Sequence, residues 1–152
     1  MMSETEPCEP FDEQCRKVVV EIFQQALDFE EAKCAQLDAV CKLAFEGENV
    51  LLVQKTGFGK TEVMVVTSLI TFGVTIIVVP LLGLGTDQLL RAQSTHKQFF
   101  SVHLDDLDEA QQDDLLEDLK DMKSDSLKSV LLFVSPQELK KVKWTSIIHE
   151  LI

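Results

Sequence analysis

The sequence predicts an α/β fold in three layers, α-β-α, around a mostly parallel sheet that is incomplete at the C-terminus. Short apolar runs of strand length alternate with amphipathic segments of helical period along most of the chain. That order implies β-α-β units and a parallel sheet. The strongest runs are rich in β-branched residues, which is typical of strands buried under helices on both faces. A glycine-rich loop also joins an early apolar run to a helix.

The chain predicts one partial domain with a short leader. Residues 1–16 are acidic and contain Pro7 and Pro10, so they are predicted to be a flexible acidic leader. Residues 17–152 are predicted to form the domain, since a chain of 152 residues can bury a real core. The net charge of −12 excludes nonspecific nucleic-acid binding by bulk charge. If the chain binds a polyanion, it must do so through a local surface patch or with a second lobe supplied by a partner.

The first half of the chain predicts two helices and a strand. Apolar residues recur at helical spacing over 17–28 and again over 31–45. Residues 46–49, Glu-Gly-Glu-Asn, indicate a helix stop and a turn. The apolar, uncharged run 50–53 then predicts a buried strand.

A glycine-rich loop follows that run and carries the chemistry. Gly57 and Gly59 allow backbone N–H groups to turn inward around phosphates, and the following helix adds the positive end of its dipole. Lys60 can reach the β- and γ-phosphates, and the Thr61 hydroxyl can ligate Mg²⁺. Gln54 stands where the strict pattern G-x-x-x-x-G-K-[ST] has its first glycine. The alternative is a strand-to-helix turn with a chance Lys-Thr pair; the pattern favours a phosphate site for a nucleotide triphosphate with Mg²⁺.

The remaining elements alternate in type. Charged residues are absent between Glu62 and Asp87, a length that could span a bilayer. Gly73 and Pro80 divide this stretch, however, so we expect a helix and a strand and no membrane span. The predicted helices are 63–72, 84–93, 107–122 and one from Pro136, the predicted strands are 74–79, 98–104 and 129–134, and a further element covers 144–152.

Two helix starts carry cap signals. Asp106 is predicted to cap the 107–122 helix, with Glu109 completing a capping box. Ser135 is predicted to cap the helix that opens with Pro136. The outer face of the 107–122 helix is acidic, which usually means a solvated face. A docking surface for a basic protein partner is the alternative, and its residues are Asp108, Asp113, Asp114, Glu117 and Asp118.

The cysteines and histidines predict no metal or catalytic centre. Cys8, Cys15, Cys34 and Cys41 form no C-x-x-C pair, and the three histidines lie far from them in sequence. Free thiols in a reducing compartment are the expectation. Because no signal peptide is visible, an intracellular protein is predicted, nuclear if the source is eukaryotic.

Several segments together resemble the first ATP-binding lobe of RecQ-like DNA helicases of superfamily 2. Helicase P-loops often have the form A-x-T-G-x-G-K-[ST], and residues 54–61 match it except at the first position. Residues 78–88, with Pro80-Leu81 and Asp87-Gln88, look like the family's motif Ia. The other similar segments are Gln36 with 46–50, the strand and acidic helix from Ser101, and 130–139.

The resemblance implies a RecA-like lobe of an ATP-dependent 3′-to-5′ DNA helicase, with roles in DNA repair and recombination. Gln36 would read the adenine edge, and Lys33 would stand where the family often has Arg. Thr61 would hold Mg²⁺ through its hydroxyl. The implied nucleotide site comprises Gln36, Lys33, Thr56, Gly57, Phe58, Gly59, Lys60 and Thr61, and the loops facing DNA carry Pro80, Leu81, Ser135 and Pro136.

Some residues depart from the family's pattern. Phe58 replaces a small residue, and Glu138 stands where a basic residue is usual. The D-E-x-H motif and the second lobe would follow Ile152, so this chain alone is not expected to have full activity. Two alternatives stay open: a non-enzymatic, degenerate helicase fragment that acts as an acidic interaction module, and a lobe of a DEAD-box RNA helicase.

Overall fold

The chain forms two compact units, Met1–Thr71 and Phe72–Ile152. The computed structural model describes residues 11–27, 30–79, 99–121, 128–141 and 144–145 of these units. Each unit has a hydrophobic core of its own. The predicted division into a leader and one domain at residue 17 stays a prediction, although helix already covers residues 13–16.

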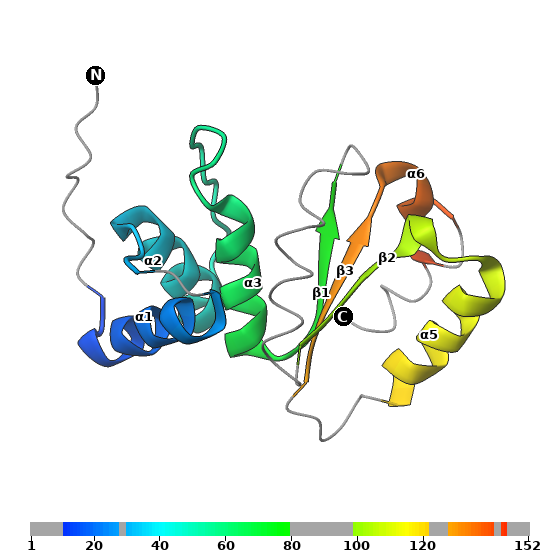
Figure 1. Ribbon diagram of the computed structural model, residues 1–152, viewed down its shortest axis with the longest axis horizontal. Helices are drawn as coiled ribbons and strands as arrows, with labels where there is room; N and C mark the ends of the chain where they lie inside the picture. Colours follow the sequence, from blue (N-terminus) through cyan, green and yellow to red (C-terminus); the bar gives the residue numbers. More distant parts are fainter. Residues whose placement is uncertain (1–10, 28–29, 80–98, 122–127, 142–143, 146–152) are drawn as a thin grey trace. The chain divides into compact units, whose positions relative to one another are not determined.

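The first unit is helical in its described part (Figure 1). Its elements are α1 (Glu13–Leu27), α2 (Cys34–Cys41), the π-helical turn η1 (Lys42–Glu46) and α3 (Lys60–Thr71). The amphipathic faces predicted for the first two helices meet in one core. Its buried residues are Val19, Phe23, Leu37, Ala39, Val40, Cys41, Val63 and Val66.

The bounds of these helices differ from the predictions. The first helix starts at Glu13, four residues earlier than the apolar spacing indicated. The predicted 31–45 helix begins only at Cys34 and widens into the π-helical turn at Lys42. The predicted stop is confirmed, because Gly47 follows in the left-handed conformation, with φ of +66°.

The predicted strand 50–53 is wrong. These residues have neither helical nor strand structure, and the described part of the first unit contains no strand with which they could pair. The alternation of a strand is nevertheless present. Val50 and Leu52 pack against the core, whereas Leu51 is 89% exposed and Val53 is 77% exposed. An apolar run without a neighbouring ladder remains a loop, since its backbone groups need partners.

The described part of the second unit is built on a sheet of three strands, and the parallel direction of these strands is as predicted. The strands are β1 (Gly73–Val78), β2 (Phe99–His103) and β3 (Ser129–Val134), in the order β1-β3-β2. Both neighbours run parallel to β3. Every residue of β3 is buried, which explains why its sequence is continuously apolar after Ser129. The α/β class with a parallel sheet is therefore confirmed.

One face of this sheet packs against α5 (Glu109–Asp121) (Figure 1). The shared core contains Leu116 and Leu119 from the helix, Leu132 from the central strand, and Trp144. The Trp144 side chain is 3% exposed. The short helices η2 (Leu104–Asp106) and α6 (Pro136–Leu139) follow β2 and β3.

The cap predicted at Asp106 is wrong, and the cap predicted at Ser135 is confirmed. Asp106 belongs to η2. The helix starts at Glu109 and its capping box joins Asp108 to Gln111: Gln111 N–H donates to Asp108 Oδ1 at 2.9 Å, and Asp108 N–H donates to Gln111 Oε1 at 3.0 Å. At α6, Glu138 N–H donates to the Ser135 hydroxyl at 3.1 Å.

The thiols are not all free. Cys34 is disulfide-bonded, whereas Cys15 and Cys41 are free. The absence of a C-x-x-C pair does not exclude a bridge, because pairing depends on distance in space. Burial raises the pKa of the Cys41 thiol. Within the described ranges no helix is long and apolar enough to cross a bilayer. The predicted 84–93 helix and nearly all of the 144–152 element lie outside the described residues.

Candidate nucleotide site

The glycine-rich loop has the backbone that a phosphate cradle requires. Gly57 and Gly59 have φ values of +78° and +97°, a region that glycine adopts without steric cost. The loop leads directly into α3, whose first two residues are Lys60 and Thr61. The first N–H groups of a helix have no intrahelical acceptors, and the helix dipole places partial positive charge there. The arrangement therefore fits an anion.

The Lys60 side chain is folded back onto its own loop. Its Nζ donates to the Gln54 carbonyl at 2.8 Å and to the Lys55 carbonyl at 2.9 Å. The Phe58 N–H also donates within the loop, to the Lys55 carbonyl at 3.3 Å. Lys60, the cation expected to bind phosphates, therefore donates to carbonyl groups of its own loop. The loop is closed on itself.

Gln36 lies against this loop, although it comes from α2. Its side chain is completely buried. Its Nε2 donates to the Phe58 carbonyl at 3.1 Å and to the Gly59 carbonyl at 3.3 Å. Its Oε1 accepts from Lys33 N–H at 2.8 Å, at the start of α2. The predicted adenine-reading residue is therefore at the site, and both of its N–H donors are engaged by the loop.

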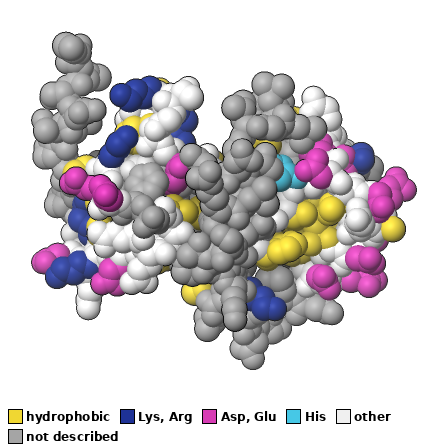
Figure 2. Space-filling view, in the orientation of Figure 1, with side chains coloured by type: hydrophobic (Ala, Val, Ile, Leu, Met, Phe, Trp, Pro, Cys, Tyr) yellow, Lys and Arg dark blue, Asp and Glu magenta, His cyan; other side chains and the backbone are white. Residues whose placement is uncertain are grey.

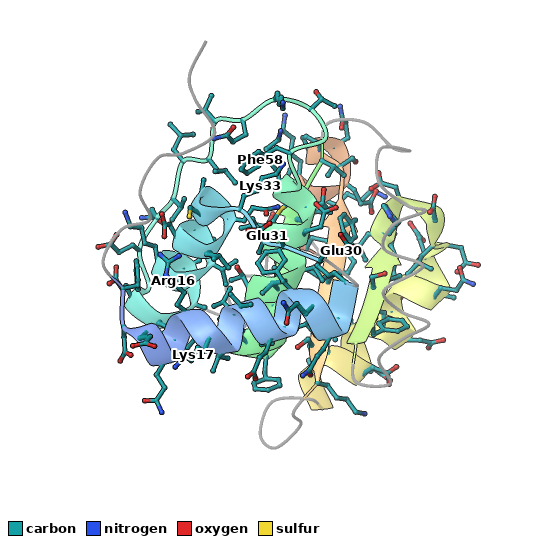
Figure 3. The ribbon with its side chains drawn as sticks, turned by 60° about the vertical axis from the view of Figure 1, so that its left-hand side comes forward. Arg16, Lys17, Glu30, Glu31, Lys33 and Phe58 are labelled. Carbon is teal, nitrogen blue, oxygen red and sulfur yellow. The ribbon has the colours of Figure 1, made fainter. Side chains whose placement is uncertain are left out.

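Phe58 is the residue of the loop that is most deeply buried. Its side chain is only 8% exposed. The Lys33 ammonium lies 4.5 Å from the centroid of the ring, within the range of a cation–π contact. Figure 3 shows the two side chains together between the loop and α2. Phe58, the residue that departs from the family's pattern, is thus packed into the site.

Position 59 requires glycine for two reasons: its φ is positive, and the Gln36 side chain approaches it closely. A Cβ atom at this position would lie 2.3 Å from Gln36 Nε2 and 3.3 Å from Glu62 Oε2. At Gly57, in contrast, a Cβ would meet nothing within 4 Å. The two glycines therefore have different structural roles.

The second unit places Ser135 in a network of its own. The Ser135 hydroxyl donates to Asp105 Oδ1 at 2.5 Å, and its N–H donates to Asp105 Oδ2 at 2.9 Å. The same hydroxyl accepts the cap bond from Glu138. The Ser135 hydroxyl proton is thus donated to the Asp105 carboxylate. This arrangement does not present a hydroxyl proton to a nucleic-acid phosphate.

Glu138 is buried beside this network and is held by two partners. Gln112 Nε2 donates to Glu138 Oε1 at 3.2 Å and to the Leu104 carbonyl at 3.0 Å. Lys141 Nζ lies 2.8 Å from Glu138 Oε2. The hydrogen bond with Glu138 raises the pKa of Lys141. The carboxylate that replaces a basic residue in the resemblance therefore holds α6 against α5.

The structure brings most of the predicted nucleotide residues together. Contacts within one unit join Gln36 to Lys33, Phe58 and Gly59, and Lys33 to Phe58. Lys60 follows Gly59 directly and contacts the Gln54 carbonyl of the same loop. Thr56 and Gly57 form the turn of the loop, and Thr61 lies in the first turn of α3. Pro80 and Leu81 lie outside the described residues, and Ser135 and Pro136 belong to the other unit.

Two features were not predicted: the loop carbonyls that accept from Lys60, and Asp105 as the partner of Ser135. Backbone acceptors leave no signal in the sequence. Asp105 and Ser135 lie 30 residues apart, so no local pattern links them. Among the described residues, no group of three or more potential metal ligands occurs. A Mg²⁺ ion would have Thr61 as its protein ligand here.

The family follows from a comparison with known protein families. A search among curated proteins found no match. The family model of the DEAD/DEAH box helicases matches residues 35–151, which begin just before Gln36 and include the loop, α3 and all three strands. A match over more than half of the chain identifies the ATP-binding lobe of a superfamily 2 helicase, and the chain belongs to the DEAD/DEAH box helicase family.

Proposed function

We propose that this chain is the ATP-binding lobe of a RecQ-like 3′-to-5′ DNA helicase and that it binds Mg·ATP through its P-loop. One observation carries the proposal. Gln36 reaches the carbonyls of Phe58 and Gly59 from α2, and Lys60 and Thr61 open α3 directly after them. An adenine-reading amide and a phosphate cradle thus occupy one site. Neither residue pattern alone would specify ATP.

Each group has a defined task when the nucleotide is bound. Lys60 would exchange its two carbonyl acceptors for β- and γ-phosphate oxygens, because a charged acceptor forms the stronger hydrogen bond. The Thr61 hydroxyl would ligate Mg²⁺, and the glycines would allow loop N–H groups to face the phosphates. ATP supplies the phosphoryl group and the free energy that a helicase converts into strand separation.

The proposal assigns nucleotide binding to this chain and not complete unwinding. Hydrolysis of a phosphoanhydride needs a group that orients water and countercharge for the transition state. No D-E-x-H tetrapeptide occurs in these 152 residues. We therefore expect an isolated chain to bind Mg·ATP and to hydrolyse it slowly or not at all.

The first test is binding of a non-hydrolysable Mg·ATP analogue by calorimetry. We expect saturable binding by the native chain and a loss of at least tenfold in affinity for Lys60→Ala, since the phosphate countercharge is removed. Lys55→Ala is the matched control, because Lys55 is an exposed lysine of the same loop. No saturable binding by a folded native chain, or equal losses in both variants, would refute the nucleotide site.

The choice of DNA over RNA rests on the RecQ-like motifs and needs its own measurement. Fluorescence anisotropy with single-stranded DNA and RNA of the same base sequence, in low salt and with the ATP analogue present, would compare the two. We expect weak binding that favours DNA. A clear preference for RNA would favour the DEAD-box alternative. The net charge of −12 predicts weak binding to either, because both are polyanions.

A second candidate function is an acidic interaction module. The outer face of α5 is the observation that favours it, since Asp113, Asp114, Glu117 and Asp118 are all exposed. Figure 2 shows acidic side chains gathered along the margin of the second unit. A basic protein could bind there by charge complementarity. A folded chain that binds no nucleotide but binds a polybasic peptide in a salt-dependent manner would favour this function.

A further inference from the structure

We propose that Phe58 is an internal competitor for the nucleotide and that it sets the ATP affinity of this site. This inference rests on the proposed function, because it concerns how the same P-loop is controlled. In the family resemblance this position has a small residue. Here it has a buried aromatic ring that joins the loop to the start of α2.

The hydrogen bonds of Gln36 hold its amide on the loop. A carboxamide has two N–H donors, and those of Gln36 are directed at the Phe58 and Gly59 carbonyls. To read an adenine edge, the amide must release at least one of these carbonyls. Because the Gln36 side chain is completely buried, that release leaves a loop carbonyl without its partner until the loop moves.

The contacts of the Phe58 ring support the same loop conformation. Phe58 is 8% exposed and has the Lys33 ammonium 4.5 Å from its centroid. These contacts hold the side chain in place and, with it, the carbonyl to which Gln36 donates. A small side chain at this position would give the loop neither burial nor a cation–π contact. Phe58 therefore stabilises the loop conformation in which the adenine-reading amide is occupied.

Internal hydrogen bonds also close the phosphate side of the loop. The Phe58 N–H donates to the Lys55 carbonyl, and Lys60 donates to the Gln54 and Lys55 carbonyls. The backbone donor and the cation that a phosphate would use are thus both satisfied internally. Since Phe58 anchors this closed loop through its ring, the loop must open before Mg·ATP can reach either group. Binding then occurs at the expense of the closed state.

The test compares native chain, Phe58→Ser and Phe45→Ala for binding of non-hydrolysable Mg·ATP and Mg·GTP analogues. Phe45 is the matched control, since it is a phenylalanine of the same unit that is 43% exposed. We expect Phe58→Ser to bind the ATP analogue about tenfold more tightly, which is about 1.4 kcal/mol. Phe45→Ala should bind like the native chain. The preference for ATP over GTP should also increase, because Gln36 is released to read adenine.

The selectivity readout separates competition from mere destabilisation. A variant that only loosens the fold would not gain affinity for one base. If Phe58→Ser does not give a cooperative thermal transition, Phe58→Leu replaces it, since a leucine keeps apolar volume and loses the cation–π contact. We then expect a smaller gain, of about threefold.

The outcomes also distinguish the two proposals. Binding by the native chain that Lys60→Ala abolishes, with no gain in folded Phe58→Ser or Phe58→Leu, overturns the inference and leaves the proposed function intact. Binding by Phe58→Ser where the folded native chain is silent supports the competition by Phe58 and refutes nucleotide binding by the native chain. Absence of binding in the folded native chain and in every Phe58 variant overturns both.

Discussion

At the scale of single residues, the two loop glycines provide a test of the Gln36 contact. Both have positive φ, so alanine at either position should destabilise the fold by roughly 1–2 kcal/mol through backbone strain. At Gly59 the added Cβ also lies 2.3 Å from Gln36 Nε2. Relief of this clash would break the buried bonds of Gln36, at about 1–3 kcal/mol more. The free energy of unfolding, measured in urea, should therefore be clearly lower for Gly59→Ala than for Gly57→Ala. Equal losses of stability in the two variants would contradict the role given to Gln36.

The same residues show how far the sequence could be interpreted. Lys60, Thr61 and the glycines are specified by local spacing, so the phosphate cradle was predictable. Gln36 is assigned to the site only through the family resemblance; the structure shows its amide hydrogen-bonded to the loop, and its role in reading adenine stays a prediction. The occupied state of its amide and the ring contact of Phe58 were not predictable. They depend on packing between α2 and the loop, which no local pattern encodes.

At the scale of elements, Ser135 links the sheet to α6 and should be sensitive to mutation. Ser135→Ala removes the cap acceptor for Glu138 N–H and the hydroxyl bond to Asp105. We expect a loss of about 2 kcal/mol in the free energy of unfolding. Gln137→Ala is the control, because Gln137 is exposed on the same short helix and should change stability by less than about 0.5 kcal/mol. Urea melts that do not separate the two variants would refute the cap.

Elements were predictable where a local signal and the tertiary pairing agree. The β-branched run of β1 and the apolar run of β3 became strands because each has a parallel neighbour. The run 50–53 has similar composition but no ladder in the described part of its unit, so it forms no strand. The capping box moved from Asp106 to Asp108 because η2 uses residues 104–106 first. Where two local sequence signals overlap, tertiary packing decides which element forms.

At the scale of the whole molecule, exposed apolar surface and net charge oppose each other. Leu51 and Val53 are 89% and 77% exposed, on a segment that has neither helical nor strand structure. Such a segment can pair with another copy. A charge of −12 keeps copies apart, but salt screens this repulsion. Association should therefore increase with ionic strength.

Light scattering after size exclusion would test this balance in the native chain, Leu51→Lys and Leu52→Lys. We expect the native chain to associate as salt increases from low to physiological concentration. Leu51→Lys should remain monomeric with an unchanged melting temperature, because its side chain contacts solvent. Leu52 is packed against the core, so Leu52→Lys should lower the melting temperature instead. A native chain that stays monomeric at all salt concentrations would show that self-repulsion outweighs the exposed segment. Association that persists in Leu51→Lys would direct attention to the edges of the sheet, since β1 and β2 each pair with β3 alone among the described strands.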